Sequence, residues 1–254
     1  MKILALEASS QCALAALEAE NDSLAQPRAV FALEEPRALS RSLVAAIDAV
    51  IRRADWTLDD IEALAVGIGP GSWTSLRVAL STAKTLAQAR GWRLAGIPTF
   101  DAMAASIWRA GSSDLPGHFL LLTTARSRPG ELYGKIYLAT REGLALIQPE
   151  WVGAPQTLAD TLGVEEMARG LEAPFVLVGE GAEEVSAILE QNGDAHLVVT
   201  LPVELLTIEI ARAAQIIWEN EDDANPLELQ PLYVAPSAAE RSLAAKSLAE
   251  PSAP

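Results

Sequence analysis

The segment from Gly67 to Thr74, which reads Gly-Ile-Gly-Pro-Gly-Ser-Trp-Thr, combines residue types that can hold an anion. It follows the apolar run 63–68 and precedes a helical pattern, so the sequence predicts a turn between a strand and a helix. Glycines let a backbone approach a ligand closely, and the unpaired N–H groups at a helix N-terminus attract negative charge. The segment lacks the Gly-Lys-Ser/Thr of a P-loop and does not fit the dinucleotide glycine pattern. A tight turn with Ser72 as the helix cap is the alternative.

The turn after the first predicted strand, Glu7-Ala8-Ser9-Ser10, is a second candidate. A carboxylate here can hold a metal-bound water, and hydroxyl groups can contact phosphates. No second carboxylate lies nearby in the sequence to share a metal ion, and small polar residues also make ordinary hairpin turns. The candidate nucleotide-binding residues are therefore Glu7, Ser9, Ser10, Gly69, Gly71 and Ser72.

Metal and nucleophile chemistry has little support. His118 and His196 are the two histidines of the chain and are far apart, and Cys12 is its single cysteine. This composition disfavours a zinc site, and no Gly-x-Ser-x-Gly elbow marks a serine nucleophile. A single cysteine also excludes an intrachain disulfide and indicates a reducing compartment. We expect no metal, no catalytic residues and no cofactor.

Two segments, 37–54 and 74–90, carry apolar residues at helical spacing. Each also has apolar residues off that stripe, Val44 and Ile51 on the first and Val78 and Leu86 on the second. A helix that is apolar on two sides buries two faces, which predicts either a thick core or a docking surface for another protein. The residues assigned to that surface are Leu39, Leu43, Ala46, Ile47, Val50, Leu76, Leu80, Ala83 and Ala87.

Composition bounds the class of protein. The 254 residues include 19 basic and 34 acidic side chains, for a net charge of −15, and 50% are hydrophobic. The charge is uneven, because residues 1–110 carry a net −1 and residues 111–254 a net −14. The acidic second half should repel nucleic acid. The longest stretch without a charged residue, 63–76, is interrupted by three glycines and a proline, so we expect no membrane span and a cytoplasmic protein.

The order of predicted elements suggests a duplicated α/β architecture. The first half shows a strand pair, a helix, a strand, the Gly67–Thr74 turn, a helix, a short strand and a further helix. The second half restarts with strands and continues with helices. We expect lobes at 1–110 and 111–254, with the boundary in 111–117 and the C-terminal helix packed back on the first lobe. From about residue 235, Ala, Ser and Pro dominate, which predicts a mobile tail.

Several segments together resemble the TsaB (YeaZ) family, a shortened relative of the TsaD family. They are 3–10, the Gly-Pro-Gly-Ser-Trp-Thr-Ser-Leu-Arg of 69–77, the Ala-Lys-Thr-Leu-Ala of 83–87, and the later motifs at 125–133, 178–181 and 231–233. The match runs over nearly the whole chain, and the motif at 69–77 is its most specific part. The sequence departs from the family pattern at Glu7-Ala8, Ser75, Thr124 and Val234-Ala235, and each departure removes polar groups that a nucleotide site would use.

The resemblance implies an actin-like (ASKHA) ATPase fold with two related lobes, each a mixed sheet flanked by helices. It also implies a non-catalytic scaffold in the complex that makes N6-threonylcarbamoyladenosine (t6A) at position 37 of tRNAs. In that family the protein activates TsaD in a heterodimer formed through the two helices of the first lobe. TsaE then docks at the junction, tRNA is contacted only indirectly, and the protein alone forms a homodimer. The alternatives are an ATP-dependent phosphotransferase of the same fold and, much less favoured, a metallopeptidase.

Overall fold

The apolar runs at the start of the chain form the predicted hairpin. In the computed structural model, β1 (Lys2–Glu7) pairs antiparallel with β2 (Cys12–Glu18), with Leu4 opposite Ala16. An outer strand, β3 (Gln26–Leu33), pairs with β2, while β4 (Ala63–Gly67) and β5 (Arg93–Ile97) extend the sheet in parallel from β1. The first sheet therefore has the order β3-β2-β1-β4-β5. The structure describes residues 1–20, 23–33, 39–111, 117–170, 174–220 and 228–234, so the tail predicted from residue 235 lies outside it.

The second sheet repeats this arrangement. Its strands are β6 (His118–Arg128), β7 (Glu131–Thr140), β8 (Leu144–Gly153), β9 (Phe175–Gly179) and β10 (His196–Val199). The order is β10-β9-β6-β7-β8, with β6, β7 and β8 antiparallel and β9 and β10 parallel to β6. Because both sheets share one strand order and one pattern of directions, the chain has the duplicated actin-like fold that the resemblance implied.

Six α-helices cover the two sheets in the described residues. They are α1 (Leu39–Arg53), α2 (Trp73–Arg90), α3 (Thr99–Ala110), α4 (Pro155–Arg169), α5 (Ala182–Asn192) and α6 (Val203–Glu219). A short 3-10 helix, Leu58–Asp60, follows α1. Glycine ends α2 at Gly91, whose φ of 69° is left-handed, and Gly193 ends α5 in the same way.

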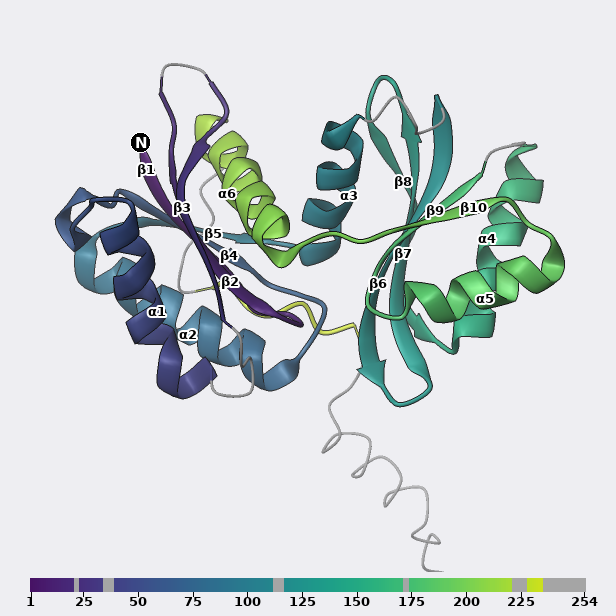
Figure 1. Cartoon of the computed structure of the whole chain (residues 1–254), viewed down its shortest axis with the longest axis horizontal. Coiled ribbons are helices and arrows are strands. Elements are labelled where there is room, and N and C mark those ends of the chain that lie inside the picture. The colour runs from purple at the N-terminus through teal and green to yellow at the C-terminus, as the bar shows by residue number, and fades with distance from the viewer. Residues whose placement is uncertain (21–22, 34–38, 112–116, 171–173, 221–227, 235–254) are drawn as a thin grey trace, which may run out of the picture.

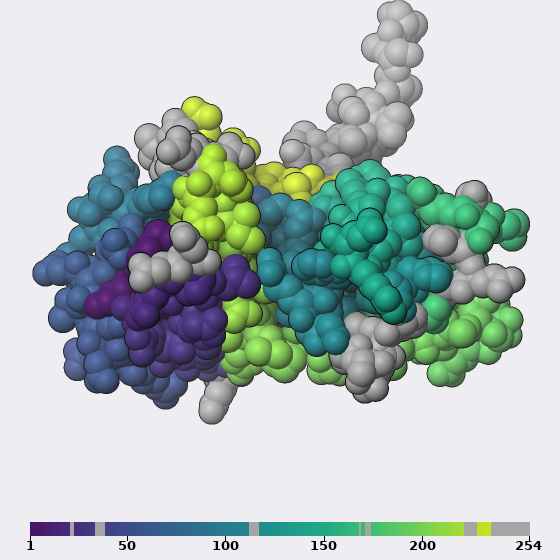
Figure 2. Space-filling model, turned by 90° about the horizontal axis from the view of Figure 1, so that it is seen from above, coloured from purple at the N-terminus to yellow at the C-terminus, as the bar shows by residue number. Residues whose placement is uncertain are grey.

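The elements stack in layers (Figure 1). Helices α1 and α2 cover the outer face of the first sheet, and α4 and α5 cover the outer face of the second. Helices α3 and α6 lie between the sheets, and α6 packs on β1 and β2 although it follows the second sheet in the sequence. Figure 2 shows α6 beside the first strands of the chain. Three apolar cores fill the spaces between layers, and the central one unites buried side chains of both sheets, such as Ile3 and Leu121, with those of α6, such as Ile210.

Polar contacts also link the second sheet to α3. The ammonium nitrogen of Lys135 on β7 donates to Asp101 of α3 at 2.6 Å and to Glu150 of β8 at 2.8 Å. The hydroxyl of Tyr137 donates to the same Asp101 carboxylate at 2.5 Å. Because Asp101 lies on the helix that follows β5, these bonds join the second sheet to the layer that continues the first.

Two strands, β3 and β10, were not predicted from the sequence. Strand β3 is mostly half-buried or exposed and begins with Gln-Pro-Arg, so it lacks the apolar run that marks a buried strand. Strand β10 has four residues, too few to show a period. No helix among the described residues combines the length and the apolar character needed to cross a bilayer.

Candidate functional site

The two glycine- and serine-rich turns predicted from the sequence lie against each other. The backbone N–H of Ser72 donates to the carbonyl of Ser9 at 2.6 Å. A Cβ added at Gly71 would lie 2.3 Å from that same carbonyl oxygen. At Gly69, which has a φ of +99°, it would lie 2.7 Å from the Leu76 side chain. The glycines of this motif therefore accommodate the neighbouring turn and the following helix, and not only a ligand.

Glu7 lies at the centre of this junction and is fully buried. Its carboxylate accepts the backbone N–H of Ser9 through Oε1 at 2.5 Å and the hydroxyl of Thr99 through Oε2 at 3.3 Å. The Thr99 hydroxyl in turn accepts the N–H of Gly69 at 3.2 Å. A Cβ at Gly67 would lie 1.9 Å from Glu7 Oε2, so this glycine makes room for the carboxylate. Glu7 thus joins three segments of the first lobe, and its carboxylate is closed off from solvent.

The roles of Thr99 and Gly67 in this junction were not predicted from the sequence. Thr99 begins α3 and lies 92 positions from Glu7, and Gly67 ends β4. The parallel pairing of β1 with β4 and of β4 with β5 brings the ends of these strands together. Only the strand order, which local patterns do not reveal, indicates such a contact.

Burial shifts the ionisation of two groups here. Desolvation raises the pKa of Glu7 above its ordinary value, against the opposing effect of the hydrogen bonds from Ser9 and Thr99. Burial and the nearby Glu7 carboxylate raise the pKa of the Cys12 thiol to about 12. Cys12 is therefore a buried thiol with little nucleophilic character.

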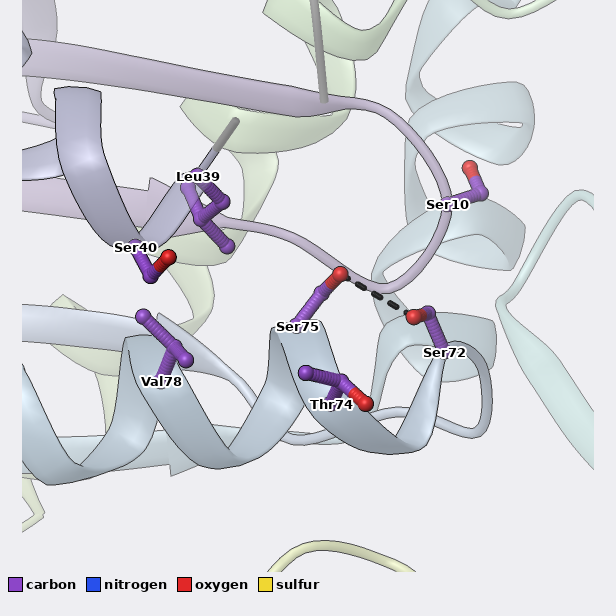
Figure 3. Close-up of a pocket in the computed structure, with 7 residues that line it drawn as sticks. All are labelled: Ser10, Leu39, Ser40, Ser72, Thr74, Ser75 and Val78. Carbon is purple, nitrogen blue, oxygen red and sulfur yellow. Dashed lines mark hydrogen bonds between the residues drawn. The ribbon is translucent and has the colours of Figure 1, made fainter. Parts of the chain in front are cut away.

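A cavity of about 300 Å³ opens beside the junction, at the N-terminal ends of α1 and α2 (Figure 3). Of the six predicted nucleotide-binding residues, Ser10 and Ser72 line it, together with Leu39, Ser40, Thr74, Ser75 and Val78. The Ser72 and Ser75 hydroxyls lie 3.0 Å apart (Figure 3). Ser72 precedes α2 as predicted, but its side chain makes no capping bond to the helix backbone, so that part of the prediction is wrong.

A second cavity of about 190 Å³ is lined by residues of both lobes. Ser10, Gln11 and Gly179 line it with two carboxylates, Glu180 and Glu183. Carboxylates facing a polyphosphate would repel it. Glu7 offers no exposed oxygen to a metal ion, and the described residues contain no cluster of three or more His, Cys, Asp or Glu side chains suited to one. The residues present therefore do not fit a metal–nucleotide complex.

The nine residues assigned to the docking surface are buried within the chain itself, with exposed fractions of 0–6%. This overturns their assignment as contact residues, because the apolar stripes of α1 and α2 pack on the first sheet. The prediction that α1 and α2 each have a second apolar side was also too broad. Ile51 is buried in the same core, and Val78 and Leu86 are partly buried against it, whereas Val44 is 72% exposed.

The outward side of α2 carries a cluster that the sequence analysis did not single out. The rings of Trp73 and Tyr233 stack with centroids 4.2 Å apart. The guanidinium of Arg77 lies 4.1 Å from the centre of the Trp73 ring, and its Nε donates to the Tyr233 hydroxyl at 3.2 Å. Tyr233 belongs to a segment that is fixed on the first lobe by the N–H of Leu232, which donates to the carbonyl of Ile68 at 2.8 Å.

Comparison with known proteins places this architecture in a family. Residues 23–215 match the family TsaD, described as tRNA N6-adenosine threonylcarbamoyltransferase. A tRNA threonylcarbamoyladenosine biosynthesis protein TsaB from Escherichia coli strain K12 is 26% identical over 97% of this chain and 100% of its own length. A tRNA N6-adenosine threonylcarbamoyltransferase from Geobacter sulfurreducens is 37% identical over 42% of this chain and 35% of its own. The solved structure of YeaZ from Pseudomonas aeruginosa has the same fold, with a TM-score of 0.63 at 18% identity over 91% of this chain and 100% of that one. The chain therefore belongs to the TsaD family of tRNA N6-adenosine threonylcarbamoyltransferases, and among its members to the TsaB (YeaZ) proteins.

Proposed function

We propose that this chain is a non-catalytic accessory subunit in the synthesis of t6A at position 37 of tRNA. The observation that carries the proposal is the burial of Glu7 where the two turns meet. The carboxylate that follows the first strand is fully buried and is bonded to Ser9 and Thr99 of its own chain. A carboxylate with no exposed oxygen does not meet a substrate or a solvated metal ion, so it is not placed to act as a base or a ligand. The name of the full-length relative from Escherichia coli supports the pathway.

The chain acts in this proposal by binding a TsaD-type catalytic subunit. The contact is made by the outward sides of α1 and α2, which belong to the first lobe, proposed as residues 1–110. A TsaE-type protein then docks on the heterodimer. The second lobe, residues 111–254, carries a net charge of −14, so tRNA is bound by the partner and not by this chain. Without the partner, the same helices pair weakly with a second copy.

The test is reconstitution of tRNA modification from purified proteins. The TsaD-type and TsaE-type proteins of the same organism, a threonylcarbamoyl donor and unmodified tRNA are combined with and without this chain, and t6A is measured by mass spectrometry of nucleosides. We expect modification to require the chain. The chain with Glu7→Gln should support modification as well as the wild type, because the proposal gives this carboxylate no chemical role.

Two outcomes would contradict the proposal. Equal modification in the absence of the chain would remove the accessory role. Modification by the chain and donor without the TsaD-type protein, abolished by Glu7→Gln, would make the chain the catalyst.

A further inference from the structure

The outward sides of α1 and α2 are polar, and their exposed apolar surface is small. Because the apolar stripes face the sheet, the opposite stripes face away from the molecule. Arg41, Ala45, Asp48 and Arg52 follow one another on the outward side of α1, and Arg77, Ser81, Thr85 and Gln88 on that of α2. Val44 is the large exposed apolar side chain among the residues of these two helices. We call this surface, formed by the outward residues of α1 and α2, the α1/α2 face.

The two helices are basic in an acidic protein. Together they contain six basic residues, namely Arg41, Arg52, Arg53, Arg77, Lys84 and Arg90, and one acidic residue, Asp48. The whole chain carries a net charge of −15, so the remaining residues are strongly negative. A local positive field on a negative molecule orients an approaching partner before contact.

The structure holds one of these cations in place. Arg77 lies over the Trp73 ring at 4.1 Å and donates to the Tyr233 hydroxyl at 3.2 Å. Tyr233 is itself 43% exposed, so aromatic surface and a positioned guanidinium stand together at the N-terminal end of α2. Arginine, tryptophan and tyrosine are the side chains that most often dominate binding energy at protein interfaces, and a side chain that is already ordered loses less entropy on binding.

We infer that the partner surface that binds the α1/α2 face is acidic, with a carboxylate opposite Arg77 and a small apolar contact opposite Val44. The inference rests on the proposed function, in which a TsaD-type protein binds these helices, and adds the chemistry of the surface that fits. A carboxylate can accept from the guanidinium while the aromatic stack shields the bond from water. Charge complementarity of this kind raises the association rate more than the final affinity.

Two other occupants fit less well. A second copy of the chain brings two positive faces together, so pairing of copies should be strengthened by salt, whereas binding of an acidic partner should be weakened. An RNA backbone is held through many phosphate contacts, whereas Arg52 is already paired with Asp48 and Arg90 with Asp59, each at 2.8 Å. A single carboxylate needs only the one positioned guanidinium of Arg77. The observations therefore favour a protein partner.

The experiment measures the association rate of the chain with the purified TsaD-type protein by stopped-flow fluorescence, over salt concentrations from about 50 to 500 mM. We expect the rate to fall about tenfold across this range, and to fall about tenfold at low salt in the variants Arg41→Glu and Arg77→Glu. Arg141→Glu makes the same charge change on an exposed turn of the second lobe and should bind like the wild type. Arg77→Lys keeps the positive charge but removes the planar guanidinium. Comparison with Arg77→Glu therefore separates the effect of the positive field from that of the contact made by the guanidinium.

The possible failures are distinguishable. If the wild type does not bind the TsaD-type protein at any salt concentration, the proposed function fails. If it binds at a rate that neither salt nor the charge reversals change, docking stands and the inference of an acidic surface is overturned. If the chain alone binds tRNA, and Arg41→Glu and Arg77→Glu abolish that binding but not partner binding, the face is an RNA site and the inference is again overturned. Circular dichroism and unfolding midpoints equal to those of the wild type establish that each variant is folded.

Discussion

Lys135 of β7 lies with its ammonium nitrogen 2.6 Å from Asp101 Oδ1 of α3, and this ion pair spans the two halves of the molecule. Burial lowers the pKa of Lys135, but the hydrogen bonds to Asp101 and Glu150 outweigh that effect and raise it above its ordinary value. The ammonium is thus charged throughout the physiological range. It also lies over the Tyr137 ring at 5.3 Å, so the pair is part of a local network.

Removing one member of this network should destabilise the protein. In Asp101→Asn, Lys135 keeps Glu150 but loses its charged partner on α3, and Tyr137 loses its charged acceptor. We expect a loss of about 1–2 kcal/mol in the free energy of unfolding, since Lys135 is buried while Asp101 is partly exposed and screened. Urea unfolding followed by tryptophan fluorescence measures this loss.

The matched control is Asp48→Asn, which makes the same chemical change in an exposed pair. Asp48 and Arg52 lie four residues apart on α1, and such pairs contribute about 0.3–0.5 kcal/mol. Equal effects of the two substitutions would show that the Asp101 network has no special role in stability.

Glu7 should make the protein less stable as the pH rises. Its folded-state pKa is raised, so the folded state holds the proton more tightly than the unfolded state. Stability from this group is therefore complete below the ordinary value of 4.5 and is lost as the pH rises through the folded-state pKa. Glu7→Gln removes this dependence, and its amide can still accept from Ser9 and donate to Thr99. We expect the variant to be more stable than the wild type at neutral pH, with the difference vanishing below pH 4.5, as measured by urea midpoints across pH. A variant less stable at neutral pH would show that the charged carboxylate is needed.

Gly71→Ala should disrupt the contact between the two turns. The added Cβ would lie 2.3 Å from the Ser9 carbonyl oxygen, so one of the turns must move. We expect a loss of roughly 2 kcal/mol or more. Gly163→Ala, in open space within α4, should instead gain about 0.5–1 kcal/mol from helix propensity. Thermal unfolding of both variants measures the contrast, and a neutral Gly71→Ala would mean that the turns are loosely packed.

Val44→Asp should weaken partner binding without unfolding the chain. Val44 is 72% exposed on α1, so a carboxylate there remains in water in the free protein but would oppose an acidic partner. Leu43→Asp, one residue away, places the same charge in the core and should unfold the protein, because Leu43 is 2% exposed. Affinity from calorimetry and midpoints from thermal unfolding distinguish the two effects. Partner binding by Val44→Asp equal to that of the wild type would place the docking surface elsewhere.

Most of the architecture could be predicted because local sequence patterns determine its elements. The β1–β2 hairpin, the turn before α2 and the helix ends at glycine follow from apolar spacing and turn residues. The outer strand β3 could not, because a half-exposed strand depends on its neighbour β2 and not on its own apolar run.

The location of the candidate site could be predicted, but its atomic contacts could not. The turns containing Ser9 and Gly71 do meet, but the atoms that crowd the glycines come from the chain itself. Apolar stripes show that a helix has a buried side, yet they do not say whether that side meets its own sheet or a partner. For Leu43 and Leu80 the answer is the sheet, and only the packed structure shows it.

The return of the chain to its first lobe has a consequence for synthesis on the ribosome. Strands β6 to β10 and the helices α4 and α5 between them are continuous in the sequence, so this half can fold as soon as it emerges. The first sheet emerges earlier, yet one of its faces packs on α6, which ends at Glu219, and Tyr233 covers Trp73 only later still. The half that is made first should therefore be the last to close, and a nascent chain that stops before α6 should expose the apolar inner face of the first sheet to chaperones.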